Sequence, residues 1–358
     1  MRLRFFFTSA RLSCALFHDG NFVRTEKMPS IRNLGRSGLR ASRIGLGCMG
    51  MSDLYGAVDE KEAKETIRLA LEAGINLLDT GDFYGMGHNE LLIARALKEF
   101  PRDQAVLSVK FGALRDPAGN WIGFDGRPEA VRNFIAYSLR RLKTDYIDIY
   151  RPARLDPRVP IEETIGAISD LVKAGYVRAI GLSEVGSETI RRAAKIHPIA
   201  DLQIEYAITS RSLERSILPT CRELGIGITA YGVLGRGLLS GKWRQDQPAR
   251  AGDIRAIIPR FQRENLLQNL ELVERIRVIA MAHNASVSQI AIAWTLSKGK
   301  DIFPLIGARR LDQLQDVLGA LEISLGSQDI AQLDLIADLV QGTRYAAPQM
   351  AHLDSEKG

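Results

Sequence analysis

Three ionisable side chains follow two expected strands. Asp79 closes the apolar run 75–79, Lys110 closes the run 105–110, and Tyr84 lies in a short loop five residues after Asp79. A lysine directly after a buried strand needs a partner to offset its desolvation, and Asp79 would supply one. Taken singly, Asp79 could equally cap a loop, and an isolated tyrosine is more often structural. Together they suit proton transfer, because an adjacent ammonium lowers the pKa of a phenol. Such a tyrosine can protonate a carbonyl oxygen while a hydride reaches carbon, or take the proton in reverse.

The elements that must position these side chains alternate along the chain. The expected strands are 44–48, 75–79, 105–110, 146–150, 177–182, 202–205, 227–230 and 302–306. The expected helices are 59–72, 89–99, 128–142, 160–173, 187–196, 213–224 and 286–296, and Ser286 is a plausible N-cap of the last one. Eight strand-then-helix units with continuous apolar strands predict an α/β fold, a single (β/α)8 TIM barrel.

Further segments lie before and between these units. The runs 31–34 and 37–41 predict an N-terminal β-hairpin that caps the barrel bottom, and the segment 232–263 is long enough to be a lid. A short helix is expected near residue 313, and extra helices are expected at the C-terminus. In such a barrel the active site forms where the strands end, which is where Asp79 and Lys110 stand.

The charge balance excludes several classes of protein. The 358 residues carry 48 basic and 42 acidic side chains, a net charge of +6 that would invite a nucleic-acid interpretation. Half of this excess lies in residues 1–27. No apolar run is long enough for a membrane span, and Cys14, Cys48 and Cys221 lack disulfide or metal-ligand spacing. We therefore expect a cytoplasmic protein with no nucleic-acid partner, no membrane partner and no metal, and its oligomeric state stays open.

The basic segment 1–27 has three interpretations. A secretory signal is disfavoured, because its apolar stretches are short, broken by Arg11 and without a small-residue cleavage site. A mitochondrial transit peptide fits the composition weakly. We favour an early-called start, with Met28 as the true initiator. The expected organisation is a leader at 1–27, a barrel at 28–345 and a flexible tail at 346–358.

The glycines at 45–50 match the G-x-G-x-x-G spacing of a dinucleotide-binding fingerprint. The following helix begins only near Asp59, and the first strand-ending acidic residue is Asp79, too far along the chain. We interpret this run as the first barrel strand leading into a loop at the site. Met49 and Tyr55 in that loop are expected to contact cofactor and substrate.

Four stretches carry a family resemblance: LDTGDFYG at 78–85, SVKFG at 108–112, GLSE at 181–184 and YGVLGRGLLSG at 231–241. They resemble the aldo-keto reductases, NADPH-dependent (β/α)8-barrel oxidoreductases, and the resemblance covers residue 31 to about residue 339. It implies three members of that family's catalytic tetrad, with the tyrosine as general acid. Those members are Asp79, Tyr84 and Lys110.

The fourth member, a histidine after the fourth strand, is missing from the matching run YRPARLD at 150–156, where its position is Ala153. The loss removes a hydrogen-bond donor to the substrate oxygen. Activity retained through Tyr84 and Lys110, a role taken over by Arg151 or Arg154, and a substrate unlike simple aldehydes all stay open. The alternative for Arg154 is a plain salt bridge under the loop.

The resemblance also implies the cofactor contacts. Ser183, Glu184 and Gln203 would hold the nicotinamide amide, and Tyr231 would stack on its ring. A glycine loop after Tyr231 allows close approach to a pyrophosphate, and the paired arginines after the last strand favour NADPH over NADH. The expected contacts of NADPH or NADP+ in these segments are Leu234, Gly235, Gly237, Leu239, Gly241, Lys242, Gly307, Arg309, Arg310, Gln313 and Asp316.

The substrate is expected in the loops 51–56, 116–126 and 243–263. The expected substrate contacts are Tyr55, Trp121, Phe124, Arg151 and Arg154. The prediction is reduction of a small-molecule aldehyde or ketone to the alcohol with NADPH, with the proton from Tyr84. One alternative is a dehydrogenase that oxidises a sugar or vitamin-type alcohol. The other is a non-catalytic NADPH-sensing subunit, against which the retained proton-donor residues argue.

Overall fold

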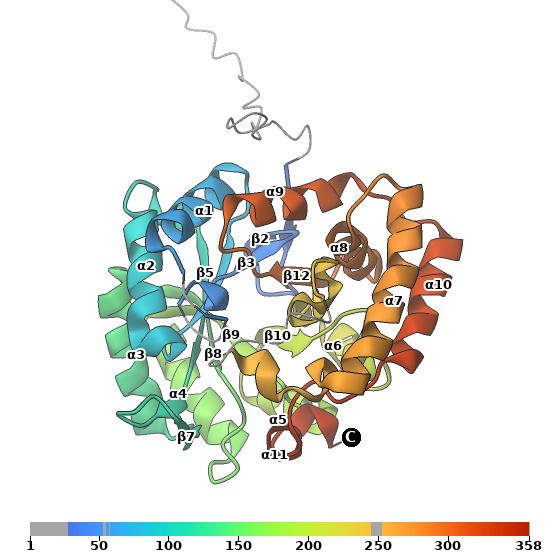
Figure 1. The fold of residues 1–358 in the computed structure, drawn as a ribbon. Helices are drawn as coiled ribbons and strands as arrows, with labels where there is room; N and C mark the ends of the chain where they lie inside the picture. Colours follow the sequence, from blue (N-terminus) through green and yellow to red (C-terminus); the bar gives the residue numbers. More distant parts are fainter. Residues whose placement is uncertain (1–27, 53–54, 57, 245–252, 358) are drawn as a thin grey trace, which may run out of the picture.

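Eight parallel strands form a closed barrel inside a ring of helices (Figure 1). This computed structural model describes residues 28–52, 55–56, 58–244 and 253–357. The expected leader at 1–27 and parts of the loops 51–56 and 243–263 lie outside the described residues. Each barrel strand pairs with the next one along the chain, and the last pairs with the first. The predicted single (β/α)8 barrel is therefore confirmed.

Each expected strand run carries one barrel strand, with ends shifted by a few residues. The barrel strands are β3 (Gly45–Gly47), β4 (Leu77–Gly81), β5 (Val106–Phe111), β8 (Ile147–Pro152), β9 (Val177–Ser183), β10 (Ile199–Glu205), β11 (Gly227–Tyr231) and β12 (Ile302–Ile306). Nearly all of their residues are buried, because side chains fill the barrel on one face and helices cover the other.

The expected helices are present, and the structure contains one long helix that the sequence pattern did not predict. The expected ones are α1 (Glu60–Glu72), α2 (His88–Leu97), α3 (Pro128–Leu142), α4 (Ile161–Lys173), α5 (Ser187–Ile196), α6 (Ile217–Leu224) and α8 (Val287–Ser297), together with the short α9 (Leu311–Gly319). Ser286 caps α8 in a capping box with Gln289, as predicted. Our sequence analysis placed no helix at α7 (Arg263–Ala282). Val278 and Met281 on the exposed face of α7 are apolar, so the sequence lacks a clear division into one apolar and one polar helix face.

A β-hairpin lies at each end of the barrel. The predicted N-terminal hairpin, β1 (Ile31–Asn33) and β2 (Arg40–Ser42), is antiparallel and extends into Leu34, which packs with Leu77 and Phe303 near the starts of their strands. A second hairpin, β6 (Ala113–Arg115) and β7 (Trp121–Phe124), forms where only a loop was expected at 116–126. It follows β5 and so lies at the end where Lys110 stands.

The C-terminal segment, which we expect to be a flexible tail at 346–358, carries regular structure in its described residues. It follows α10 (Ser327–Ile336) and contains α11 (Ala347–Ala351) and a 3-10 turn at Asp354–Glu356. Asp354 accepts a hydrogen bond from the Gly186 amide, and Glu356 pairs with Arg344. Gly186 and Asp354 are 168 residues apart, so no local sequence pattern predicts this hydrogen bond. Within the described residues, no helix is long and apolar enough to span a membrane.

Candidate active site

Asp79 and Lys110 form a buried ion pair at the mouth of the barrel. Strands β4 and β5 run side by side with Asp79 opposite Ser108. Lys110 Nζ lies 2.5 Å from Asp79 Oδ1, and Ser108 Oγ donates to Asp79 Oδ2 at 2.9 Å. Burial lowers the pKa of Lys110, and the charge of Asp79 opposes that shift. The structure thus brings together the two side chains that the strand ends predicted.

Tyr84 begins the turn after β4 and is almost fully buried. Its ring centre lies 5.1 Å from Lys110 Nζ. Burial raises the pKa of the Tyr84 phenol well above its usual value, the charge of Asp79 raises it further, and Arg154 opposes the shift. This direction corrects our expectation of a lowered pKa, because desolvation and the carboxylate outweigh nearby cations. Tyr84 is accordingly a protonated phenol at neutral pH.

Gln203 reaches the same carboxylate from the opposite side of the barrel. It stands near the end of β10, and its Nε2 donates to Asp79 Oδ2 at 2.6 Å. Asp79 therefore receives hydrogen bonds from an ammonium, a hydroxyl and an amide. Gln203, which we expect at the nicotinamide amide, thus holds Asp79 and lines the cavity with it.

The region of the missing histidine is occupied by small and basic residues. Ala153 is buried and packs against Tyr84 and Phe83. Arg154 lines the cavity, donating to the Ala153 carbonyl at 2.6 Å and to the Tyr345 hydroxyl at 3.2 Å. Arg151 is the other basic residue of this run that we expect to contact the substrate. Its side chain is fully buried inside the barrel, 3.0 Å from an Asp201 carboxylate oxygen, and it does not line the cavity.

A cavity of about 920 Å³ opens beside Tyr84 and extends to the loop after β12. That volume is in the range of small-molecule and cofactor sites. Expected site residues that line it are Met49, Tyr55, Trp121, Phe124, Arg154, Gln203, Tyr231, Leu234, Gly237, Lys242, Gly307, Arg309, Gln313 and Asp316. Expected cofactor residues outside its lining are Ser183, Glu184, Gly235, Leu239, Gly241 and Arg310.

The two adjacent arginines after β12 separate in the structure. Arg309 lines the cavity and donates to the Tyr55 carbonyl at 3.1 Å, whereas Arg310 pairs with Asp312 on α9 at 3.0 Å. Burial and the neighbouring arginines lower the pKa of Arg309, as expected for a cation without close anionic compensation. An anionic ligand at this end of the cavity would therefore meet Arg309 before Arg310.

Glu184 binds the C-terminal segment and does not line the cavity. It has a left-handed φ of 53° and a fully buried side chain. Arg344 Nη2 donates to Glu184 Oε2 at 2.6 Å, Ser355 Oγ donates to the same oxygen at 2.7 Å, and the Tyr231 hydroxyl donates to Oε1 at 2.7 Å. Burial alone would raise the pKa of Glu184, but Arg344 holds it below its usual value. The carboxylate that we expect at the nicotinamide amide is thus engaged by Arg344, Ser355 and Tyr231.

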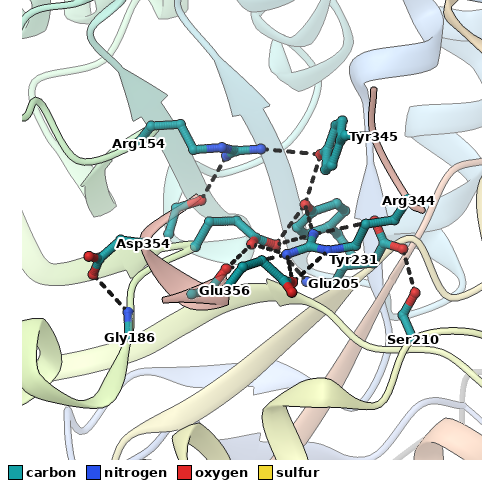
Figure 2. A network of polar contacts seen from close by, with 12 residues as sticks. Arg154, Gly186, Glu205, Ser210, Tyr231, Arg344, Tyr345, Asp354 and Glu356 are labelled. Carbon is teal, nitrogen blue, oxygen red and sulfur yellow. Dashed lines mark hydrogen bonds and ion pairs between the residues drawn. The ribbon is translucent and has the colours of Figure 1, made fainter. Parts of the chain in front are cut away.

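Tyr345, which our sequence analysis missed, lies among the site residues (Figure 2). Its hydroxyl is 2.9 Å from that of Tyr231, and the Arg236 guanidinium lies 4.5 Å from its ring centre. Figure 2 shows Arg344 reaching from the same segment toward Tyr231 and Glu205. The only local signal was an arginine-tyrosine pair in a polar stretch, which by itself indicates nothing about the site.

Comparisons with known proteins agree with this geometry. The model of the aldo/keto reductase family matches residues 43–338. A probable aldo-keto reductase 1 of Glycine max is 41% identical over 315 residues, covering 87% of this chain and 90% of that protein. A glycerol dehydrogenase structure from Gluconobacter oxydans has a TM-score of 0.78 at 30% identity, covering 91% of this chain and 96% of that one. The holo form of a Bacillus halodurans aldo-keto reductase has a TM-score of 0.71 at 26% identity, covering 90% and 99%.

The chain therefore belongs to the aldo/keto reductase family. It is an oxidoreductase that acts on carbonyl or alcohol groups, and members of this family generally use nicotinamide cofactors.

Proposed function

We propose that this protein reduces an aldehyde or ketone to the alcohol with NADPH and that Tyr84 is the general acid. The observation that carries the proposal is the buried Asp79–Lys110 pair beside Tyr84, at the wall of a cavity that also contains Arg309. A protonated phenol beside a buried cation can donate a proton to an oxygen on which negative charge develops.

The residues present fit a nicotinamide dinucleotide. One cavity is lined by Tyr84, Tyr231 and Arg309, so it offers an aromatic ring and a cation together with the phenol. Tyr231 would stack on the nicotinamide, while Lys242 and Arg309 would meet the phosphates. When bound, NADPH supplies the hydride. The chain itself positions the carbonyl, donates the Tyr84 proton and places Lys110 where it lowers the cost of charge on the oxygen.

The cofactor preference can be tested at Arg309. We expect Arg309→Gln to weaken NADPH binding by about 10-fold and NADH binding much less, because only NADPH carries a 2′-phosphate. Arg310→Gln should have a smaller effect, since Asp312 already holds that guanidinium. Fluorescence titration of both cofactors measures this, and equal losses for the two would contradict the assignment of Arg309.

The activity itself is tested by NADPH oxidation with aldehydes, diketones, quinones and pyridoxal. We expect turnover of at least one class, with Tyr84→Phe as the inactive control. Tight NADPH binding without turnover of any compound would support the sensing subunit instead.

Oxidation of an alcohol is the second candidate, because the solved relative from Gluconobacter oxydans is a glycerol dehydrogenase. The same residues serve that direction, with Tyr84 accepting the proton. Measuring both directions with one matched carbonyl and alcohol pair decides which is faster at neutral pH.

A further inference from the structure

Arg154 differs from the other arginines around the C-terminal segment. Its guanidinium donates only to neutral oxygens: the Ala153 carbonyl at 2.6 Å, the Tyr345 hydroxyl at 3.2 Å and Ser183 Oγ at 3.4 Å. Within the part of the chain that the structure describes, no carboxylate lies within ion-pair distance of it. The plain salt bridge considered as an alternative is therefore absent from these residues.

The neighbouring arginines have carboxylate partners. Arg344 pairs with Glu184 and Glu205, while Arg236 and Arg260 also approach Glu205. These glutamates are buried and already engaged, so their charge is shared among other cations. The Glu184 charge acts on Arg154 without an ion pair, so Arg154 is left as a cavity-facing cation with no direct anionic partner among the described residues.

The cavity beside Arg154 combines its charge with aromatic surface. Trp121, Phe83 and Phe124 contribute aromatic surface to the same cavity, which excludes water from part of its wall. A charge removed from water needs an opposite charge or strong hydrogen bonds, and a guanidinium matches a carboxylate with two parallel donors. An anion entering this cavity would supply what the protein does not.

Arg154 also lies close to the reacting position. Ala153, the residue before it, belongs to the same buried cluster as Tyr84. The charge of Arg154 opposes the raised pKa of the Tyr84 phenol, and both side chains line the same cavity. A substrate whose carbonyl oxygen faces Tyr84 would thus carry its anionic group a few bonds from that carbonyl, with its apolar part against the aromatic wall.

We propose that Arg154 binds a carboxylate of the substrate, so that the site selects carboxylate-bearing aldehydes and ketones over neutral ones of the same size. This rests on the proposed carbonyl reduction. In the reaction the hydride of NADPH forms the new C–H bond, the C=O π electrons move to oxygen, and Tyr84 donates its proton there. NADP+ and the alcohol result, and the carboxylate stays unchanged on Arg154.

A matched pair of aldehydes tests the selection: 4-formylbenzoate and its neutral counterpart 4-formylbenzamide, which have similar size and electron withdrawal. We expect kcat/KM to favour the benzoate by about 10-fold or more, mainly through KM. Arg154→Gln should abolish this preference, whereas Arg154→Lys should keep part of it by retaining the charge. Arg127→Gln is the control, because Asp125 holds that exposed guanidinium and it does not line the cavity.

The outcomes separate this inference from the proposed function. Equal turnover of both aldehydes, or a preference that survives Arg154→Gln, would overturn the carboxylate assignment and leave carbonyl reduction intact. An equal fall in kcat for both aldehydes with the preference unchanged would assign Arg154 to the carbonyl oxygen, which also overturns it. No turnover of any carbonyl compound overturns the proposed function. In that case calorimetry can compare the affinities of the unreactive 4-methylbenzoate and 4-methylbenzamide without any turnover. Equal affinities would contradict the binding of a carboxylate by Arg154.

Discussion

At the scale of single residues, the proposed reduction depends on the Tyr84 phenol and the charges around it. Tyr84 has a raised pKa because burial and Asp79 disfavour its phenolate, so the neutral phenol is the form present at physiological pH. A proton donor in that state suits reduction directly. Ala153 occupies the position of the missing histidine, in the same buried cluster as Tyr84. The next residue, Arg154, places a guanidinium in the cavity lining where the family has an imidazole one residue earlier.

The first prediction concerns the proton donor. We expect Tyr84→Phe to lower kcat for carbonyl reduction by about 10²–10⁴-fold, because removing a positioned general acid costs that much. Cofactor affinity should change little, since the ring remains. Steady-state kinetics with a fluorescence titration of NADPH checks both. A variant that keeps most of its activity would remove Tyr84 from its role.

The second prediction is a pH dependence with opposite signs in the two directions. Reduction needs the phenol, which persists through neutral pH because the pKa of Tyr84 is raised, so its rate should stay level there. Oxidation needs the phenolate, so its rate should climb as pH rises toward that raised pKa. Initial rates in both directions from neutral to alkaline pH measure this. An oxidation rate that is already maximal at neutral pH would contradict it.

At the scale of elements, the C-terminal segment is joined to the end of β9. Glu184 follows β9 in a left-handed conformation, and Arg344 reaches it with both side chains almost fully buried. Tyr231 at the end of β11 donates to the same carboxylate. A segment far along the chain thereby fixes a side chain that we expect to stack on the cofactor.

The third prediction tests this ion pair. Arg344→Met should lower the free energy of unfolding by about 3–5 kcal/mol, because it leaves Glu184 buried and charged without its partner. Adding Glu184→Gln should recover much of that loss, since an uncharged amide no longer needs the guanidinium. Urea unfolding of the single and double variants measures the coupling. Additive losses would show that the two side chains act independently.

The third prediction extends to acid, because the Glu184–Arg344 ion pair should make the free energy of unfolding depend on pH. Because Arg344 holds the pKa of Glu184 below its unfolded value, the stabilisation is fully present above the unfolded pKa. It should be lost only as pH falls from the ordinary glutamate range toward the lower folded value. Wild type and the double variant, compared by thermal unfolding from neutral to acidic pH, should therefore converge in acid, and a constant difference would contradict the linkage.

At the scale of the whole molecule, described residues within 28–357 form the closed barrel and the walls of the candidate site. The hairpin β1–β2 covers the bottom of the barrel, and the hairpin β6–β7 and the C-terminal segment stand at the site. Every contact described for the site joins residues beyond position 46.

The fourth prediction follows for the basic segment 1–27. Deleting it should leave Tm and carbonyl reduction unchanged, because the described contacts of later residues already form the barrel and line the candidate site. Thermal unfolding and kinetics of the two chain lengths provide the comparison. An insoluble or inactive shorter chain would contradict this and would give 1–27 a role in folding or activity.

The sequence by itself determined the barrel and the location of its chemistry. Alternating apolar runs and amphipathic helices are local signals, and parallel strands in a barrel bring their ends to one rim, so the pairing of Asp79 with Lys110 follows from their positions along the chain. Only the tertiary structure decided the roles of Glu184, Arg344 and Tyr345, because contacts across more than a hundred residues leave no local pattern. Burial likewise reversed the expected pKa shift of Tyr84, since desolvation depends on everything packed around a group and not on its neighbours in the chain.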